Sequence, residues 1–241
     1  MKTFYIILAL LTGLGLVTLA VLAFWGFWFW PVVYRPRGDR KRVACVGDSS
    51  VYGMFLPNWF RHAWPHRLGL LLRPRYQVIN FGQNKATAMH SGVHPYRSYR
   101  KYRLSLEAQP DLVLLGFGTN DSKAENWQGP ASFVEEYTSL ITAYREALPD
   151  ANILILTPPY AFPHPKRTEG PGFYGVQPAI VTEIRDAIID MCGSLGLPVF
   201  DLYAYTEGRR DWFIFDGVHP NIPGAQRIAE ALAAEIDKLH K

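Results

Sequence analysis

Short apolar runs alternate with longer amphipathic stretches from residue 43 to the end of the chain. Each run is bounded by glycine, proline or polar residues, as buried strands are. We expect strands at 43–46, 76–81, 111–117, 152–156 and 197–203. Because strands that alternate with helices at this spacing form parallel sheets with helices on both faces, the pattern predicts an α/β fold.

The stretches between these runs carry apolar residues at helical spacing. We expect helices at 57–72, 96–108, 131–147, 178–195 and 223–239. Residues 157–177 are rich in proline and glycine, so they predict a long loop rather than a regular element. A loop of this length inside a compact domain is often functional.

The first 34 residues are of a different kind. No charged residue occurs from Thr3 to Tyr34, and such a run is long enough to cross a hydrocarbon core of ~30 Å. A cleaved signal peptide is the alternative, but cleavage after Ala23 would leave a run of exposed aromatic residues at the new N-terminus. We therefore predict one N-terminal transmembrane helix within residues 1–34.

A basic juxtamembrane linker, residues 35–42, follows the predicted anchor and holds four arginines and one lysine. Only Lys2 is basic on the other side, and this asymmetry favours a cytoplasmic position for the rest of the chain, with the opposite face as the alternative. The linker also explains the pI of about 9.0, because the remainder of the chain carries nearly balanced charge. The basic balance therefore suits anionic lipid headgroups and gives no support for nucleic-acid binding.

A serine lies directly after the first predicted strand, in the turn Gly47-Asp48-Ser49. The carboxyl ends of the strands are where an open α/β sheet collects ligand chemistry. A serine nucleophile needs a histidine base, a carboxylate that orients this histidine, and donors for an oxyanion. Asp216 and His219, three residues apart before the last predicted helix, can supply the carboxylate and the base.

Two further polar turns follow the second and third predicted strands. They are Asn80-Phe81-Gly82 and Gly118-Thr119-Asn120-Asp121. Each turn taken singly is ordinary loop or N-cap chemistry. All four turns fall where the strand ends gather, so together they favour a nucleophile, a base, an orienting carboxylate and oxyanion donors in one place.

These four blocks, in this order, resemble those of the SGNH (GDSL-type) hydrolase superfamily over roughly residues 42–238. The resemblance implies a three-layer α/β/α flavodoxin-like fold with a five-stranded parallel sheet. In this chain the SGNH hydrolase domain would occupy residues 43–241, after the transmembrane anchor and the basic linker. The expected localisation is therefore the bacterial inner membrane, with a single membrane-spanning segment.

The resemblance also implies a role for each matching residue. Ser49 would be the nucleophile, His219 the general base and Asp216 the residue that orients His219. The oxyanion hole would combine the backbone N–H groups of Ser49 and Gly82 with the side-chain amide of Asn120. No metal and no organic cofactor is implied by this chemistry.

Two positions depart from the superfamily pattern. Lys85 occupies the last glycine position of the usual N-x-G-x-x-G block, which leaves the backbone path of that loop open. Ser50 stands where leucine is frequent, which leaves the chemistry intact.

The expected substrate is an ester of a small molecule or a glycan. The third block, residues 118–127, resembles the version in bacterial members associated with carbohydrate O-acetyl removal, including sialate O-acetylesterase-like members. O-acetyl groups on carbohydrate are therefore the expected substrate. Four aromatic residues are candidates for a sugar platform: Trp127, Tyr160, Phe162 and Tyr174.

Three alternatives stay open. In a lysophospholipase or acyl thioesterase, a membrane anchor would bring the active site to its substrate. A catalytically idle module that binds envelope polysaccharide is an alternative of another class, which the intact catalytic set argues against. A metallophosphoesterase with Asp48 and His219 as ligands lacks a second Asp/His cluster at ligand spacing. The oligomeric state is not indicated by the sequence.

Overall fold

The computed structural model describes residues 5, 11–21, 38–166 and 170–239. It divides into two compact units, Met1–Arg35 and Pro36–Lys241. In the first unit, residues 11–21 are helical and exposed. Among the described residues, none of the helices has the length and apolar character that a membrane span requires. Most of the predicted anchor lies outside the described residues, so the anchor stays a prediction.

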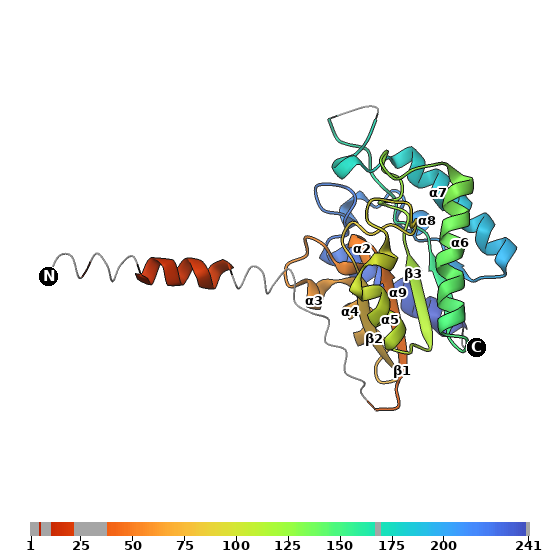
Figure 1. Cartoon of the computed structure of the whole chain (residues 1–241), viewed down its shortest axis with the longest axis horizontal. Helices are drawn as coiled ribbons and strands as arrows, with labels where there is room; N and C mark the ends of the chain where they lie inside the picture. Colours follow the sequence, from red (N-terminus) through yellow and green to blue (C-terminus); the bar gives the residue numbers. More distant parts are fainter. Residues whose placement is uncertain (1–4, 6–10, 22–37, 167–169, 240–241) are drawn as a thin grey trace. The chain divides into compact units, whose positions relative to one another are not determined.

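A parallel five-stranded sheet forms the centre of the second unit, in the order β2-β1-β3-β4-β5 (Figure 1). The strands are β1 Lys41–Gly47, β2 Tyr76–Gly82, β3 Leu112–Gly116, β4 Asn152–Leu156 and β5 Val199–Phe200. The order reverses direction between β1 and β3, which is where a doubly wound sheet opens a crevice at its carboxyl edge. The predicted five-stranded parallel sheet is thus confirmed, and β1 begins within the predicted basic linker.

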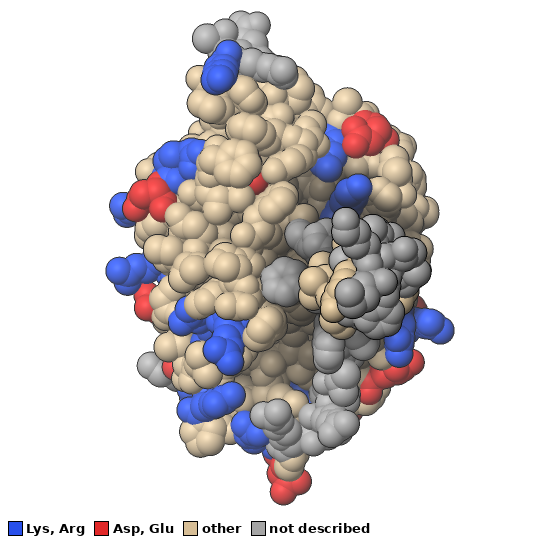
Figure 2. Space-filling view, turned by 90° about the vertical axis from the view of Figure 1, so that its left-hand side faces the viewer, with Lys and Arg blue, Asp and Glu red and all other residues tan. Residues whose placement is uncertain are grey.

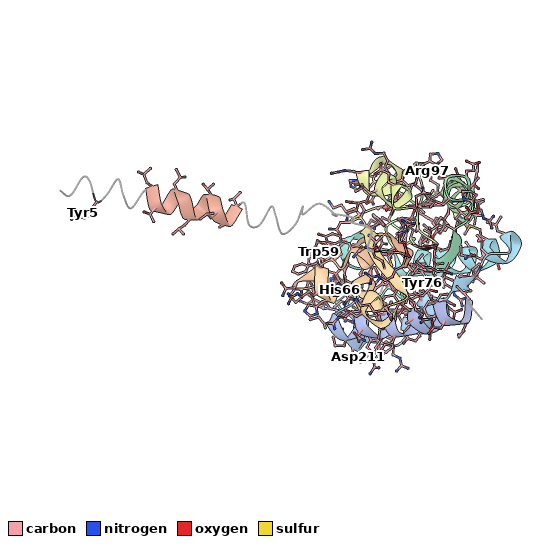
Figure 3. All side chains as sticks on the ribbon, turned by 90° about the horizontal axis from the view of Figure 1, so that it is seen from below. Tyr5, Trp59, His66, Tyr76, Arg97 and Asp211 are labelled. Atoms are coloured by element: carbon pink, nitrogen blue, oxygen red, sulfur yellow. The ribbon has the colours of Figure 1, made fainter. Side chains whose placement is uncertain are left out.

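Helices cover both faces of this sheet. They are α2 Ser49–Tyr52, α3 Trp59–His62, α4 Trp64–Leu71, α5 Arg100–Glu107, α6 Pro130–Ala147, α7 Pro178–Leu195, α8 Leu202–Thr206 and α9 Ile222–Leu239. Short 3₁₀ turns occur at Tyr96–Ser98, Phe173–Gly175 and Arg210–Trp212. In Figure 3, Arg97 beside α5 and Asp211 beside α9 lie on opposite sides of the domain, as a three-layer arrangement requires.

Three of the predicted elements are wrong in extent. The helix expected at 96–108 begins only at Arg100, because residues 96–98 form a 3₁₀ turn and Tyr99 is extended, with ψ 148°. The single helix expected at 57–72 is divided into α3 and α4 at Ala63, whose ψ is 143°. Pro65 has no N–H to donate to the carbonyl of Arg61, so one continuous helix cannot pass this point. The strand expected at 197–203 is only β5, because the Asp201 side chain accepts a hydrogen bond from the N–H of Ala204 and starts α8.

The core has an aliphatic side and an aromatic side. On one face of the sheet, α4 and α9 pack over apolar residues of β1, β3 and β4. On the other side, the fully buried rings include those of Phe81, Tyr96, Phe117, Phe133, Tyr137 and Tyr144. Each such ring contributes ~1.5–3 kcal/mol through burial, so the sheet that carries the polar turns is held rigidly from both faces.

Glycines end the three strands that meet below the first polar turn. Gly47 lies in register with Gly82 of β2 and with Gly116 of β3. A Cβ atom at Gly82 would lie 2.2 Å from the backbone nitrogen of Tyr52 in α2. The absence of side chains here lets α2 sit directly on the strand ends, and this contact fixes the height of Ser49 above the sheet.

One face of the molecule shows charged side chains of both signs. On the face shown in Figure 2, uncharged atoms cover most of the area, and basic and acidic side chains lie scattered among them.

We expect Gly82→Ala to lower the free energy of unfolding by about 2 kcal/mol, because the added methyl group must displace the backbone of α2. Gly193→Ala is the matched control: no atom lies within 4 Å of a Cβ at this position in α7. Alanine there favours the helix, so the control is expected to be neutral or to gain up to about 1 kcal/mol. Urea denaturation of both variants measures the difference, and equal effects would contradict the packing account.

Candidate active site

The structure brings Ser49, Asp216 and His219 together at the carboxyl edge of the sheet. The Nε2 atom of His219 lies 3.0 Å from Oγ of Ser49, and its Nδ1 atom lies 2.7 Å from Oδ2 of Asp216. All three residues are buried, with Ser49 exposed by only 8%. The geometry is that of a nucleophile, a base and an orienting carboxylate in one hydrogen-bonded line.

Ser49 owes its position to a very short helix. It is the first residue of α2, and the carboxylate of Asp48 caps this helix by accepting the N–H of Ser50 at 2.8 Å. The helix ends after one turn at Gly53, which adopts the left-handed conformation with φ 88°. This strand-to-helix turn presents the Ser49 hydroxyl toward His219.

Asp216 is held as an ionised carboxylate. Burial raises its pKa, but the hydrogen bonds and charge of His219, together with the backbone N–H of Val218, outweigh this effect and lower the pKa below its usual value. An ionised Asp216 can only accept hydrogen bonds, so Nδ1 of His219 carries the proton. Nε2 is then left to accept the hydroxyl proton of Ser49.

Arg210 supports the loop that carries Asp216 and His219, and the sequence analysis missed this arginine. Its guanidinium donates to the carbonyl oxygens of Phe213 at 3.3 Å, Ile214 at 2.7 Å and Phe215 at 2.8 Å. Such a fork satisfies several loop carbonyls at once, as arginine does through its planar set of donors. No motif in the sequence marks a residue of this kind.

Asn120 lies beside Ser49, in the wall of the same pocket. Its side-chain amide donates to the carbonyl oxygen of Ala86 at 3.1 Å, which leaves one amide hydrogen for a further acceptor. The side chain of Asn126 donates to the backbone oxygen of Asn120 at 2.8 Å and fixes the turn. The predicted amide donor is therefore well placed for negative charge near Ser49.

The prediction that the N–H of Gly82 is a donor of the oxyanion hole needs correction. Its N–H donates to Oδ1 of Asn80 at 2.9 Å, and the Asn80 amide in turn donates to the carbonyl oxygen of Val51 at 3.0 Å. Gly82 does not line the pocket around Ser49, whereas Lys85 does. The hydrogen bond to Asn80 and the close packing against α2 assign Gly82 a structural use.

The pocket that contains Ser49 and His219 has a volume of about 190 Å³. Its lining residues come from several loops after the strands: Ser49, Met54, Phe55, Asn84, Lys85, Thr119, Asn120, Lys123, Tyr174, Val176, Val218 and His219. One part of this wall is apolar and another carries the two lysines and the amides.

Backbone strain is concentrated around this pocket. Among the described residues, five other than glycine have a positive φ, and three of them line the pocket: Phe55 at 65°, Lys85 at 66° and Tyr174 at 59°. A left-handed backbone costs such residues ~1–2 kcal/mol each. Strained residues of this kind cluster at ligand sites, where the strained backbone orients a side chain that takes part in binding or catalysis.

Two of these strained residues form an aromatic wall beside His219. The ring centroid of Phe55 lies 5.1 Å from that of His219, and Tyr174 lies 5.7 Å from it. Phe55 is 44% exposed and Tyr174 is 48% exposed, so both rings are open to a ligand. Of the four aromatic residues proposed as a sugar platform, Tyr174 alone lines the pocket.

The other three pack elsewhere. Trp127 lies against Phe133, with ring centroids 6.3 Å apart. Tyr160 and Phe162 contact each other at 4.7 Å. No motif in the sequence marks Phe55, whose left-handed backbone in the folded chain turns the ring toward His219.

Two further buried carboxyl groups, those of Asp48 and Asp121, lie close to the site. Burial raises the pKa of Asp48 to about 6, although the N–H of Ser50 and the charge of His219 lower it in part. Burial also raises the pKa of Asp121 to about 7, and the nearby Asp48 adds to this effect. Asp121 ties two loops together by accepting from the N–H groups of Met89 at 3.0 Å and Gly118 at 3.1 Å.

Metal-ligand geometry is not found in the described part of the chain, where no three His, Cys, Asp or Glu side chains converge on one point. Cys45 and Cys192 are both free and buried, as expected for two small apolar residues.

Known proteins of one family are similar to this chain. The model of the GDSL-like Lipase/Acylhydrolase family matches residues 45–227. An acetylxylan esterase of Xylanibacter ruminicola is 31% identical over 218 residues, which cover 83% of this chain and 44% of that protein. A GDSL esterase/lipase of Arabidopsis thaliana is 29% identical over 133 residues, which cover 50% of this chain and 52% of that protein. The chain thus spans about half the length of these two relatives.

Solved structures share the fold at lower identity. A carbohydrate acetylesterase from Sinorhizobium meliloti has a TM-score of 0.67 at 19% identity, over 83% of this chain and all of that one (100%). An aryl esterase of M. smegmatis has a TM-score of 0.66 at 22% identity, over 83% of this chain and 99% of that one. At these identities the likeness establishes the fold.

We expect the stability of the protein to fall as the pH rises through about 6, because the folded state holds the proton of Asp48 more tightly than the unfolded chain does. This contribution is complete below pH ~4 and is lost above the raised pKa. Asp48→Asn keeps an oxygen for the helix cap and removes the titrating carboxyl group. In this variant the decrease of the unfolding free energy between pH 4 and 8 should therefore be smaller by about 2 kcal/mol. Denaturant unfolding across this pH range measures it, and parallel curves for both proteins would contradict the assignment.

Proposed function

The chain belongs to the GDSL-like lipase/acylhydrolase family, and from this membership we propose that it is a serine esterase that removes O-acetyl groups from carbohydrate. The observation that carries the proposal is the continuous hydrogen-bonded line from Asp216 through His219 to Ser49, at 2.7 Å and 3.0 Å. A serine in such a line becomes a nucleophile at neutral pH, whereas an isolated serine is a weak one.

In the first step, Oγ of Ser49 attacks the carbonyl carbon of the ester while Nε2 of His219 takes the hydroxyl proton. The ionised carboxylate of Asp216 stabilises the imidazolium that forms. His219 then gives the proton to the leaving sugar oxygen, and the acetyl group stays on Ser49. Water attacks this acyl-enzyme with His219 again as the base, and acetate and the free Ser49 hydroxyl result.

The oxyanion of each tetrahedral intermediate needs fixed donors. We assign the backbone N–H of Ser49, the side-chain amide of Asn120 and the backbone N–H of Lys85 to this role. Ser49 is the first residue of α2, so its N–H has no acceptor within the helix. Lys85 replaces Gly82 in this assignment because Lys85 lines the pocket, while the N–H of Gly82 is engaged with Asn80.

The size of the pocket supports a short acyl group. At about 190 Å³ it is smaller than the ~300–1,000 Å³ typical of sites for drug-sized ligands, so a long acyl chain has little room. The acetylxylan esterase and the carbohydrate acetylesterase among the similar proteins support acetate on a sugar. The exposed rings of Phe55 and Tyr174 offer a face for the sugar ring.

Membrane attachment is part of the same proposal. The uncharged run from Thr3 to Tyr34 supports an N-terminal anchor, and the basic residues at 35–42 favour the cytoplasmic face of a bacterial inner membrane. An anchored esterase of this kind would act on esters near the membrane surface.

We expect Ser49→Ala to abolish hydrolysis of 4-nitrophenyl acetate and labelling by a fluorophosphonate probe, because the hydroxyl that is hydrogen-bonded to His219 is lost. Ser50→Ala is the matched control: this serine is adjacent and similarly buried, and its hydroxyl does not contact His219. The control should keep most of the activity, and circular dichroism should show both variants folded.

The same assay tests the acyl group. The unaltered protein should hydrolyse the acetate ester faster than the octanoate ester. Activity that survives in Ser49→Ala would refute the mechanism, and a preference for eight carbons would favour a lysophospholipase or thioesterase.

We expect Asn120→Ala to reduce kcat ~10²–10³-fold, because one donor to the oxyanion is lost. Asn152→Ala, at the exposed start of β4, removes an amide far from the pocket and serves as the control. Steady-state kinetics on 4-nitrophenyl acetate, with thermal unfolding measured in parallel, separates the catalytic loss from a loss of folded protein. A kcat within a few-fold of the unaltered value would remove Asn120 from the oxyanion hole.

A further inference from the structure

One long segment of the domain carries basic residues and no acidic ones. From Ser49 to Leu106 the sequence has no aspartate or glutamate, whereas nine lysines and arginines occur there. They are Arg61, Arg67, Arg73, Arg75, Lys85, Arg97, Arg100, Lys101 and Arg103. The nearly balanced charge of the domain therefore hides an uneven distribution, and the reaction at Ser49 uses none of these positive charges.

Four of these residues, all arginines, belong to the stretch 59–75, which holds α3, α4 and the turn before β2. Within the described residues, Arg75 is the one arginine of the four that forms an ion pair, with Asp237 at 2.7 Å. Arg61 and Arg73 are exposed, and Arg67 is half-buried. Three arginines of this stretch thus lack a carboxylate partner in the part of the chain that the structure describes.

The electrostatics of His66 place these arginines close together. Partial burial lowers the pKa of His66, and the positive charges of Arg67, Arg73 and Arg61 lower it further, with a contribution from His62. Arg67 donates from Nη2 to Nδ1 of His62 at 2.6 Å. The Nε atom of Arg67 is buried and has no hydrogen-bond partner among the described residues. His66 therefore lies at the centre of a cluster of positive charge.

Exposed apolar side chains are interleaved with this cluster. Phe60 is 49% exposed, and Leu70 and Leu71 are each 44% exposed. Leu68 and Leu72, in contrast, are buried where α4 packs on α9 and β2. The contact of α4 with the core uses these buried residues, so the exposed leucines are available to a partner.

We call this surface the docking face, and it consists of Phe60, Arg61, His66, Arg67, Leu70, Leu71 and Arg73. In Figure 3, Trp59 of α3 and His66 of α4 lie on the same side of the domain. Arginines combined with exposed Phe and Leu on a short helical surface are typical of segments that lie in the headgroup region of a bilayer. A nucleic acid would match the arginines but would leave the leucines in water.

The docking face is joined to the turn that carries the nucleophile. Trp59, at the start of α3, stacks on Tyr52, at the end of α2, with ring centroids 4.6 Å apart. Ser49 is the first residue of the same one-turn helix. A partner bound against α3 therefore lies close to the helix that presents Ser49.

We propose that the docking face binds the surface of a bilayer that contains anionic phospholipid. The arginines lie at the phosphate groups, and Phe60, Leu70 and Leu71 reach the acyl boundary. This contact uses the folded domain, so it is distinct from the predicted N-terminal anchor, and it does not depend on the reaction at Ser49. Its effect is to fix the orientation of the domain on the membrane.

A dye on the docking face tests the proposal. The full-length Leu71→Cys variant is labelled with bimane, because Cys45 and Cys192 are buried, and is placed in nanodiscs that contain nitroxide-bearing lipid. We expect the dye to be quenched in nanodiscs rich in phosphatidylglycerol, and several-fold less in pure phosphatidylcholine or at high sodium chloride. Ser194→Cys, exposed near the end of α7, is the matched control and should stay unquenched. An N-terminal anchor alone would not distinguish the two labels.

Charge variants assign the contact to the arginines. Arg61→Gln and Arg73→Gln should each lower the ratio of docked to free domain about fivefold, which corresponds to ~1 kcal/mol for each basic residue near an anionic surface. Arg145→Gln, at an exposed position of α6, should leave the ratio unchanged. Thermal unfolding measured in parallel shows that the variants are folded.

Equal quenching of the two labels, or equal quenching in neutral and anionic bilayers, would overturn the proposal. A response of the Leu71→Cys dye to single-stranded RNA, without quenching by lipid, would also overturn it and would assign the face to a nucleic acid. Absence of ester hydrolysis by the same preparation would refute the proposed function and would leave the result for the docking face unchanged.

Discussion

The hydrogen bond between His219 and Ser49 joins residues that are 170 positions apart, and it forms only if the first and last loops of the domain meet at one edge of the sheet. The rigid core makes this possible. Glycine at the strand ends lets α2 sit on the sheet, which sets the height of Ser49. Arg210 pins the carbonyls of the last loop, which sets the position of His219. A shift of about 1 Å in either support would break a contact of this length.

The pocket around this contact is built by strained loops on an unstrained sheet. Phe55, Lys85 and Tyr174 keep left-handed backbones in three different loops. The buried rings on one side of the sheet and the aliphatic cluster on the other stabilise the domain enough to hold them. Their side chains give the pocket its aromatic and cationic character, so the fold stabilises a local arrangement that the loops alone would not adopt.

Several elements follow from local sequence rules. The apolar runs that became β1 to β4 are bounded by glycine and polar residues, and the long helices α6, α7 and α9 lie where helical spacing predicted them. The prediction failed where a single residue interrupts the pattern. Pro65 divides one predicted helix because it has no N–H to donate, and Asp201 ends β5 early because its carboxylate caps α8. Most of the predicted anchor lies outside the described part, whereas β1 begins within the predicted linker.

The sequence by itself determined which residue types are available at the strand ends, because order along the chain and the topology of a parallel sheet dictate where those ends gather. It therefore indicated Ser49, Asn120, Asp216 and His219 as candidates. Only the tertiary structure decided that the N–H of Gly82 donates to the side chain of Asn80. It also decided that Phe55, Lys85 and Lys123 line the pocket, whereas Gly82 does not. These facts depend on backbone conformation and on packing between distant loops, and neither leaves a pattern along the chain.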